Sequence, residues 1–485
     1  MAQSYQDGSC KLSTLDQLMP RIYSTMFLVY ETDQYENAVK TLNEGLAKAT
    51  SVLPYLRGSV HKSDDPRNQL TLSWSPQDPA PTVAETPAPE SLPSFEQLKQ
   101  DNGPLSVFQD ALAPVPALIN YQVPGTKVPT FVIGVTRLEG GLIMSLCAHH
   151  VVMDGAGMGL FLKLWGDCIR GEPSGADGKA PFDAGEVHHR ESWLREASGF
   201  SKNEPKATLE ELLRQHPEFS LRSIPSSMPA TVPSQPTKYA AKIFAFSSAK
   251  LQEAKQAISG AVPAKSLTIN NVLGATLWLS ITRIRLERMR RNGPAPAADS
   301  TTKLGFAINA RSRLGPAVSS KSFLGNVTML KVVEFPATKL ENIAGNALAN
   351  PSSADLPLME PVISAMAAAT AAVTPTHVSE MIAFAERIGD FEEIGPGWNS
   401  FHLDLSYTSW ANLGMYDADF GPSLGGKPRF VRIPYMPYID GMVLALPRRG
   451  PADGEAVERI EVALMLNEED MRALEEDEIL RSWSV

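Results

Sequence analysis

Two histidines and an aspartate lie close together near position 150, and side chains of these types can support proton transfer. His149 and His150 end a short apolar run, and Asp154 follows four residues after His150. An imidazole has an ordinary pKa of roughly 6.5, so it can take a proton from an attacking hydroxyl or amine as a general base. A reaction at an alcohol needs such a base, because a neutral hydroxyl is a poor nucleophile. We therefore take His150 as the candidate base, while Asp154 could orient its ring or pair with a cation elsewhere in the chain.

A buried strand and a following helix are expected to position these side chains. Residues 142–148 form an almost continuous apolar run, which at this length favours a strand buried on both faces. Apolar residues at helical spacing then extend to Arg170, after glycines at alternate positions. The strand would hold the imidazole rigidly and the turn would expose it. His149 points to the other side of an extended chain and is expected to have a structural role.

Simpler interpretations of the same residues must be weighed against the catalytic one. An isolated histidine in an apolar run is most often a hydrogen-bonded core residue, and Asp-Gly is a common turn dipeptide. Gly155, Gly157 and Gly159 superficially resemble a phosphate-binding loop. They lack the lysine of a Walker motif and the spacing of a dinucleotide motif, so the sequence excludes nucleotide binding there.

Composition predicts a folded protein of two domains. The chain has 485 residues, of which 43% are hydrophobic and 20% charged, and this composition argues against disorder. A formal net charge of −10 argues against a general binder of nucleic acids or anionic membranes. No run approaches the roughly 20 apolar residues of a membrane span, and the polar start lacks the apolar core of a signal peptide, so a cytoplasmic location is expected. Three scattered cysteines predict neither a disulfide framework nor a zinc site, and we expect no bound metal.

The order of strand and helix patterns predicts α/β architecture in both halves. A β-branched run, Thr130 to Arg137, is expected to form a hairpin with the strand that ends at His150. The proline-rich run 76–93 is expected to be a surface loop without sheet pairing. A second polar, proline-rich stretch marks a crossover between domains. The predicted division is an N-terminal domain at residues 1–200, the crossover at 201–236 and a C-terminal domain at 237–485.

The HHxxxDG signature of the chloramphenicol-acetyltransferase-like superfamily is matched by His149, His150, Asp154 and Gly155. That superfamily includes the BAHD acyltransferases and the condensation domains of peptide synthetases. Further segments resemble BAHD motifs in the family's order: Leu12-Ser-Thr-Leu-Asp16, Thr268-Ile-Asn-Asn271, Asn309-Ala-Arg311, Phe323-Leu-Gly-Asn326, Thr408-Ser-Trp410, Asp419-Phe-Gly421 and Gly426-Lys-Pro428. The resemblance covers nearly the whole chain, and its loops and doubled histidine are most similar to fungal members such as trichothecene 3-O-acetyltransferases. One segment departs from the pattern, because Pro422 to Gly425 stands where the family has a single tryptophan.

The resemblance implies two chloramphenicol-acetyltransferase-like α/β domains, with mixed sheets flanked by helices and a tunnel at their interface. It implies an acyltransferase in which His150 removes a proton from an alcohol or amine of a secondary metabolite. Acyl-CoA, with acetyl-CoA favoured, would be the cosubstrate, and no cofactor would stay bound. In the family Asp154 faces away from the base and pairs with an arginine, here Arg311. Trp410 would donate its indole N–H to the oxyanion, although a packed aromatic side chain is an equal alternative.

The resemblance also assigns supporting roles. Asp419 and Gly421 would maintain the shape of the domains, and Thr268 would line the cofactor tunnel. Five arginines between positions 283 and 291 could contact coenzyme A phosphates, but most such runs are solvated helix faces, and we expect that here. The protein is expected to be a monomer that acts on small molecules, without nucleic-acid or membrane partners.

Two other functions remain open. A free-standing condensation domain would use the same histidine with a carrier-protein thioester, although the TSW and DFG motifs favour the BAHD family. A repurposed scaffold would keep the fold without acyl transfer, and the altered segment after Gly421 is the feature that favours it. Activity with free acetyl-CoA would exclude the first alternative. Retention of the biological activity by His150→Ala would support the second.

Overall fold

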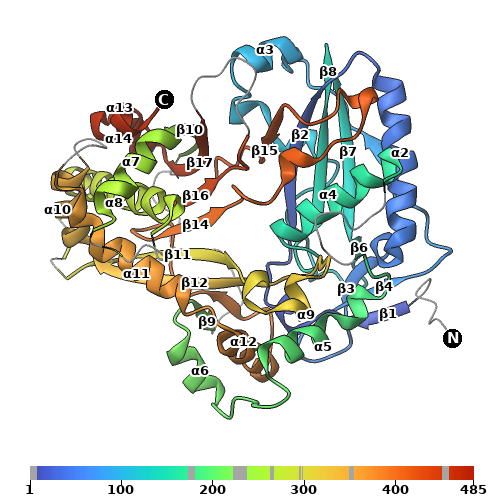
Figure 1. The fold of residues 1–485 in the computed structure, drawn as a ribbon, viewed down its shortest axis with the longest axis horizontal. Coiled ribbons are helices and arrows are strands. Elements are labelled where there is room, and N and C mark those ends of the chain that lie inside the picture. The colour runs from blue at the N-terminus through green and yellow to red at the C-terminus, as the bar shows by residue number, and fades with distance from the viewer. Residues whose placement is uncertain are drawn as a thin grey trace.

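The computed structural model describes residues 8–172, 181–221, 238–260, 262, 267–293, 296–297, 299–348, 354–449 and 458–485. The predicted start of the N-terminal domain and positions 222–236 of the predicted crossover lie outside the described residues. Figure 1 shows two groups of sheets and helices: the blue and teal elements of the first half lie on one side, and most green to red elements lie on the other.

Two sheets lie mainly in the first half of the chain. The five-stranded sheet has the order β15 (Phe430–Arg432), β2 (Tyr23–Glu31), β8 (Gly141–His149), β7 (Phe131–Leu138) and β5 (Val83–Glu85). The four-stranded sheet has the order β1 (Gly8–Lys11), β4 (Leu70–Trp74), β3 (Ser59–Lys62) and β6 (Lys127–Pro129). The helices of this half are α1 (Thr14–Gln17), α2 (Tyr35–Val52), α3 (Phe95–Gln100), α4 (Gly155–Arg170) and α5 (Glu186–Ser198).

The second half is built on a six-stranded mixed sheet. Its order is β10 (Tyr239–Ser247), β17 (Arg459–Asn467), β16 (Met442–Ala445), β14 (Leu405–Ser409), β11 (Thr301–Asn309) and β12 (Thr328–Pro336). A two-stranded sheet pairs β9 (Phe219–Leu221) with β13 (Ile394–Pro396). The helices are α6 (Leu209–Gln215), α7 (Ser248–Ile258), α8 (Ile269–Asn292), α9 (Pro316–Ser319), α10 (Ala337–Ala347), α11 (Glu360–Ala371), α12 (Pro375–Arg387), α13 (Glu468–Glu476) and α14 (Glu478–Trp483).

Strand β8 is buried along its whole length, as its apolar sequence predicted. It lies between β2 and β7, and β7 and β8 form the predicted antiparallel hairpin. Leu142, Met144 and Leu146 belong to the core that includes α2 and α4, whereas Ile143 belongs to a separate core with α3 on the opposite face. Because both faces are covered, the strand has no polar alternation, and its end is a rigid support for His150.

The alternating glycines at the start of α4 allow close packing against the second half of the chain. A Cβ atom at Gly157 would lie 2.0 Å from the carbonyl oxygen of Leu324, and one at Gly159 would lie 2.1 Å from that of Leu413. These distances are far shorter than van der Waals contact, so only glycine fits at either position. The first turn of α4 can therefore touch two loops of the other half, and these glycines serve packing rather than phosphate binding.

Gly159→Ala should destabilise the protein by roughly 1 to 3 kcal/mol, since the added methyl group would meet backbone that cannot rotate away. Gly345→Ala, in helix α10, is a matched control, because a Cβ there meets no atom within 4 Å. That change should stabilise the protein by about 0.5 to 1 kcal/mol, since alanine is the better helix former. Urea unfolding measures both effects, and equal stability of Gly159→Ala and the unchanged protein would contradict the packing argument.

Three segments differ from the sequence predictions. Residues 415–433 do not follow the predicted division, because β15 pairs with β2 and Phe420 and Leu424 pack in the first core. A strand of three residues carries no sequence signal of the sheet that it joins. The proline-rich run 76–93 contains β5, a short strand parallel to β7 that occupies a proline-free interval at the sheet edge.

The predicted crossover is also more regular than expected, because it contains α6 and β9. Helix α6 begins with a capping box between Thr208 and Glu211. Within the described ranges no single helix is long and apolar enough to cross a membrane. The segments Leu356–Ala371 and Pro375–Arg387, bent by 72° at their junction, reach that length and composition only as a pair.

Candidate active site

His150 is the first residue after β8, and its backbone is held on both sides. Its N–H donates to the carbonyl oxygen of Ile22 at 2.9 Å. Its own carbonyl oxygen accepts a hydrogen bond from Nδ2 of Asn326, also at 2.9 Å. The strand before it, the segment that carries Ile22 and the loop that carries Asn326 therefore fix the position of the imidazole.

The ring of His150 is half-buried, and its two nitrogens have different surroundings. Nδ1 is buried and has no well-aligned hydrogen-bond partner in the described part of the chain. Nε2, unlike Nδ1, is not buried, so it lies on the accessible side of the ring. Burial lowers the pKa of His150 below its ordinary value, although its own carbonyl group, Asp154 and Asn326 act in the opposite direction. The ring is therefore neutral at physiological pH, as a general base must be.

His149 has the buried environment that its predicted structural role requires. Its Nδ1 accepts the N–H of Val151 at 3.3 Å, and its Nε2 lies 2.7 Å from the hydroxyl oxygen of Tyr121. Since Nδ1 is an acceptor, Nε2 carries the proton and donates to the tyrosine. Burial lowers the pKa of His149 to about 3, so this ring stays neutral and does not compete with His150 for protons.

Asp16 and Asn326 support His150, although local sequence patterns did not identify them as site residues. Oδ1 of Asp16 accepts both the backbone N–H and the side-chain Nδ2 of Asn326, each at 2.8 Å. The second proton of that amide goes to His150, so Asp16 orients the group that holds the histidine carbonyl. Both residues occur in segments that resemble family motifs, Leu12-Ser-Thr-Leu-Asp16 and Phe323-Leu-Gly-Asn326, and this resemblance is the sequence signal for them. Their proximity across 310 positions could not be deduced from spacing.

Asp154 and Arg311 lie together, as the resemblance implied. Two guanidinium nitrogens of Arg311 lie 2.8 and 3.0 Å from the two carboxylate oxygens of Asp154. The carboxylate also accepts the N–H groups of Gly157 and Val327 and the hydroxyl of Thr328, at 2.9, 3.0 and 3.0 Å. Burial alone would raise the pKa of Asp154, but the arginine and the backbone donors outweigh it and lower the pKa. Asp154 thus caps α4 and joins the two halves of the chain. Its carboxylate oxygens are occupied by these hydrogen bonds, so the residue has a structural role.

A second buried ion pair holds the loop that carries Asn326. Arg190 on α5 donates to Glu186 at 2.9 Å and to the carbonyl oxygen of Val152 at 2.8 Å. Glu186 in turn accepts the N–H of Leu324 at 2.9 Å. The turn after His150 and the loop before Asn326 are therefore tied to the same helix.

Trp410 lies beside the start of α4. Its backbone N–H donates to Ala445 at 2.8 Å, which places its half-buried indole at the end of β14. A Cβ atom at Gly155 would lie 3.5 Å from Nε1 of Trp410. The indole N–H has no acceptor within the described residues. It is therefore available to a ligand near the helix terminus, although the ring also packs against two core clusters.

Asp419 and Gly421 form a loop packed on the first half. Oδ1 of Asp419 accepts the N–H of Gly421 at 2.9 Å, and Arg170 donates to the Asp419 carbonyl oxygen. Gly421 has φ +79°, a conformation that strains other residues. The unusual segment that follows forms a short turn in which Ser423 accepts a hydrogen bond from Thr32 at 2.7 Å. The insertion thus fills a structural position against the first half.

Thr268 begins helix α8, where its hydroxyl oxygen accepts the N–H of Asn271 at 3.1 Å. The residue is exposed, and its predicted role in a cofactor tunnel stays a prediction. No ligand contact is needed to explain this threonine, because N-caps of this type stabilise helices by about 1 kcal/mol.

The arginines of α8 form the predicted solvated face only in part: Arg290 and Arg291 are exposed, whereas Arg285 and Arg288 are held by carboxylates. Arg285 is fully buried and donates to Asp440 at 2.7 Å and to the carbonyl oxygen of Asp404 at 2.9 Å. Arg288 makes two hydrogen bonds to Asp470, at 2.6 and 3.0 Å. The solvated-face prediction is wrong for these two residues, because they attach α8 to neighbouring elements. Sequence patterns show charge but not the partners that neutralise it.

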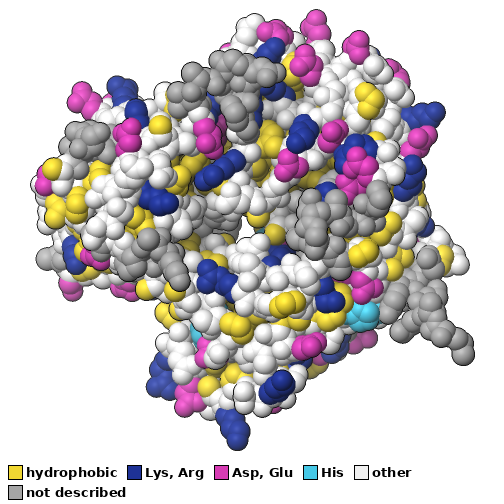
Figure 2. All heavy atoms as spheres, in the orientation of Figure 1, with side chains coloured by type: hydrophobic (Ala, Val, Ile, Leu, Met, Phe, Trp, Pro, Cys, Tyr) yellow, Lys and Arg dark blue, Asp and Glu magenta, His cyan; other side chains and the backbone are white. Residues whose placement is uncertain are grey.

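The surface is hollowed between the two halves. Figure 2 shows this hollow near the centre of the face that Figure 1 presents, where the elements of the first half meet those of the second. The start of α4 and the end of β14 both belong to this junction, as the contacts of Gly155, Gly159 and Trp410 require.

Comparisons with known proteins agree with this architecture. A model of the Transferase family matches residues 1–480. Trichothecene 8-O-acetyltransferase of Fusarium sporotrichioides is 31% identical to this chain over 494 residues, and the alignment covers 97% of each chain. O-acetyltransferase dmxR13 of Cryptosporiopsis sp. is 26% identical over 479 residues, and the alignment covers 95% of this chain and 93% of the relative. The crystal structure of F. graminearum TRI101 complexed with coenzyme A and T-2 mycotoxin aligns with a TM-score of 0.77 at 20% identity, over 98% of this chain and 99% of that one.

The chain therefore belongs to the Transferase family of BAHD acyltransferases, and it is an acyltransferase. The predicted two-domain α/β fold of this family is confirmed.

Proposed function

We propose that the protein transfers an acyl group, with acetyl favoured, from acyl-CoA to a hydroxyl group of a secondary metabolite. Amine acceptors are compatible with the same chemistry. The observation that carries the proposal is the neutral, half-buried His150, with Nε2 on its accessible side. The named relatives are O-acetyltransferases, and TRI101 was crystallised with coenzyme A, which supports this donor.

In the proposed reaction, Nε2 of His150 takes the proton of the acceptor hydroxyl as its oxygen attacks the thioester carbonyl carbon. A tetrahedral intermediate forms, and the Trp410 indole N–H donates to its oxyanion. The intermediate then collapses, the carbon–sulfur bond breaks, and the histidine returns the proton to the leaving thiolate. No covalent acyl-enzyme is involved. Asp154, Arg311, Asp419 and Gly421 act by maintaining structure.

Incubation of the protein with a panel of acyl-CoA donors and alcohols, followed by mass detection of products, tests the proposal. A trichothecene with a free hydroxyl is a suitable first acceptor, because two relatives are named for such substrates. Ester formation with acetyl-CoA alone would also exclude a condensation domain that requires a carrier protein. Absence of any product across chemically varied alcohols and amines would favour the repurposed scaffold instead.

The pH dependence of activity should follow the lowered pKa of His150. A general base acts only when unprotonated, so kcat/KM should be constant above about pH 6.5 and should fall tenfold per pH unit below the folded-state pKa. Measurement of kcat/KM from pH 4.5 to 8.5, with a stability control at each pH, checks this. An acid limb centred above pH 6.5 would contradict the assignment.

Protein stability should also fall with acid. The unfolded chain binds a proton to His149 near pH 6.5, whereas the folded chain does so only near pH 3. Between these values stability is lost as pH decreases, by about 2 kcal/mol at pH 5. The activity profile must therefore be recorded within the stable range.

Asn326→Ala should lower kcat by about 10- to 100-fold with little change in KM, because His150 loses the amide that holds its carbonyl oxygen. Since Asn326 raises the pKa of His150, the acid limb should also move to lower pH. A merely structural role would not produce that shift. Asn346→Ala removes an exposed helix amide and is the control. An unchanged pH profile would argue against positioning by Asn326.

A further inference from the structure

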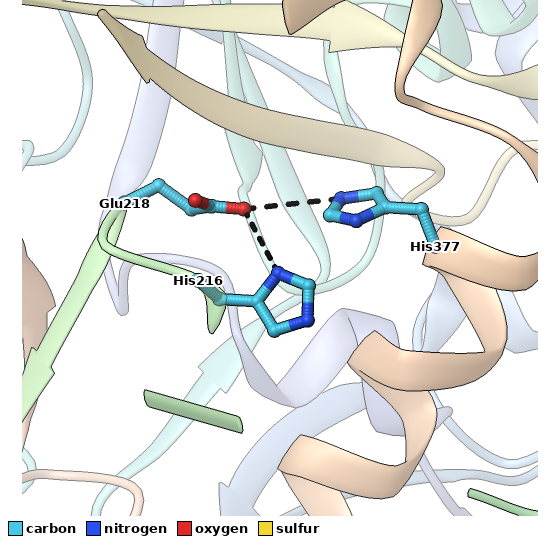
Figure 3. A group of neighbouring side chains, drawn as sticks. All are labelled: His216, Glu218 and His377. Carbon is cyan, nitrogen blue, oxygen red and sulfur yellow. Dashed lines mark ion pairs between the residues drawn. The ribbon is translucent and has the colours of Figure 1, made fainter. Parts of the chain in front are cut away.

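Two histidines and a glutamate meet in a buried cluster of the second half. His216 follows α6, Glu218 precedes β9, and His377 lies in the first turn of α12. They are 3%, 1% and 4% exposed. Figure 3 shows the Glu218 carboxylate directed between the two imidazole rings. Neither the proposed acyl transfer nor the family motifs involve these residues.

The three side chains have the spacing of metal ligands. Oε1 of Glu218 lies 3.4 Å from Nδ1 of His216 and 3.9 Å from Nε2 of His377. One ligating atom from each residue lies within 4.8 Å of the other two. A tetrahedral zinc ion with bonds of about 2.0 to 2.1 Å separates its ligand atoms by roughly 3.4 Å. A small contraction of the cluster would therefore complete the coordination geometry.

Three of the four imidazole nitrogens lack a hydrogen-bond partner within the described residues. Both ring nitrogens of His216 and Nε2 of His377 are buried without one. Buried polar atoms in folded proteins are nearly always paired, because an unpaired one costs roughly 1 to 3 kcal/mol. Nδ1 of His216 and Nε2 of His377 both face Glu218 without a well-aligned hydrogen bond, which indicates a missing ligand.

Two further charged groups border the cluster. Nζ of Lys331 lies 2.9 Å from Oε1 of Glu218 and 3.5 Å from Nδ1 of His377. Oε2 of Glu380, on α12, lies 3.4 Å from Nε2 of His216. The lysine neutralises Glu218 and lies within hydrogen-bond distance of Nδ1 of His377, so it would compete with a bound cation. Glu380 is 31% exposed and lies on the solvent side of the cluster.

We propose that His216, Glu218 and His377 bind a divalent transition metal of the zinc type. Imidazole nitrogen and carboxylate oxygen are ligands that zinc accepts together. The ion would tie the α6 and β9 segment to α12 and would have a structural role. The sequence showed no sign of this site, because its three ligands are separated by up to 161 positions.

Cobalt and zinc titrations of the full-length protein, after treatment with EDTA and dialysis, test the site. Co²⁺ should bind with about one equivalent and give visible absorption bands, and Zn²⁺ should displace it. His377→Gln and His216→Ala should weaken binding by at least about tenfold. His402→Ala removes an exposed histidine elsewhere and should bind like the unchanged protein. Zinc at 100 times its dissociation constant should raise the unfolding midpoint by about 3 °C.

A Lys331→Met variant tests the metal site even if the variants of the ligands fail to fold. Removal of the competing ammonium should tighten Zn²⁺ binding by at least about tenfold. Absence of binding in both the unchanged protein and Lys331→Met would overturn the site. Equal loss of binding in His402→Ala and His377→Gln would also overturn it, because the metal would then lie elsewhere. These readouts do not use acyl transfer, so they stand or fall independently of the proposed function.

Discussion

Replacement of His150 by alanine should reduce kcat for acyl transfer by roughly 10²- to 10⁴-fold, the range expected for loss of a general base. The protein should still fold, because the hydrogen bonds to Ile22 and Asn326 come from the His150 backbone and persist in alanine. The half-buried ring makes no side-chain hydrogen bond of its own through Nδ1. Steady-state release of free thiol from acetyl-CoA, with a saturating acceptor, measures the change.

His402→Ala is the matched control for this experiment, since it removes an exposed histidine and should leave kcat within twofold. Equal unfolding midpoints for the two variants would show that any loss of activity is chemical. If His150→Ala retained activity within tenfold of the unchanged protein, another group would have to act as the base. If it retained the biological activity without any acyl transfer, the repurposed scaffold would be the correct interpretation.

Asp154→Asn should destabilise the protein by roughly 3 to 5 kcal/mol, because it leaves the Arg311 charge buried without its partner. Both side chains are almost fully enclosed, with 2% exposure for Asp154 and 9% for Arg311. Asparagine is also a good N-cap, so this variant keeps the cap of α4 and isolates the effect of charge. Urea unfolding gives the free energy, and kcat should fall together with stability because α4 begins beside His150.

A double-mutant cycle with Arg311→Met separates pairing from general damage. The double variant should be more stable than the sum of the single changes predicts, by about 2 kcal/mol, since neither charge is then left alone. The donors from Gly157, Val327 and Thr328 remain in every variant that keeps Asp154. Additivity within about 0.5 kcal/mol would show that the two side chains do not stabilise one another.

Much of the environment of His150 was predictable from local sequence. The apolar run before it forms β8, the following periodicity forms α4 up to Arg170, and Asp154 caps that helix. The hairpin of β7 and β8 also agrees with the sequence. These features depend on hydrophobic periodicity, turns and caps, which act between residues close together in the chain.

Other features of the site could not be predicted in this way. Asp16 lies 310 positions from the Asn326 that it orients, and Arg285 is buried against Asp440 although it belongs to a cluster of five arginines between positions 283 and 291. Such contacts depend on how the two halves pack. The pairing of Asp154 with Arg311 was anticipated from the family resemblance and not from the residues themselves.

The sequence by itself determined a strand that delivers a histidine to the start of a helix, an α/β chain of two domains, and the ordered motifs of an acyltransferase. Only the tertiary structure decided which side of that histidine stays accessible, which amide holds it, and that β15 completes the first sheet. It also brought His216, Glu218 and His377 together. The reason is physical: periodicity and capping are local energies, whereas burial, ion pairing and ligand geometry arise only when distant segments exclude water from one another.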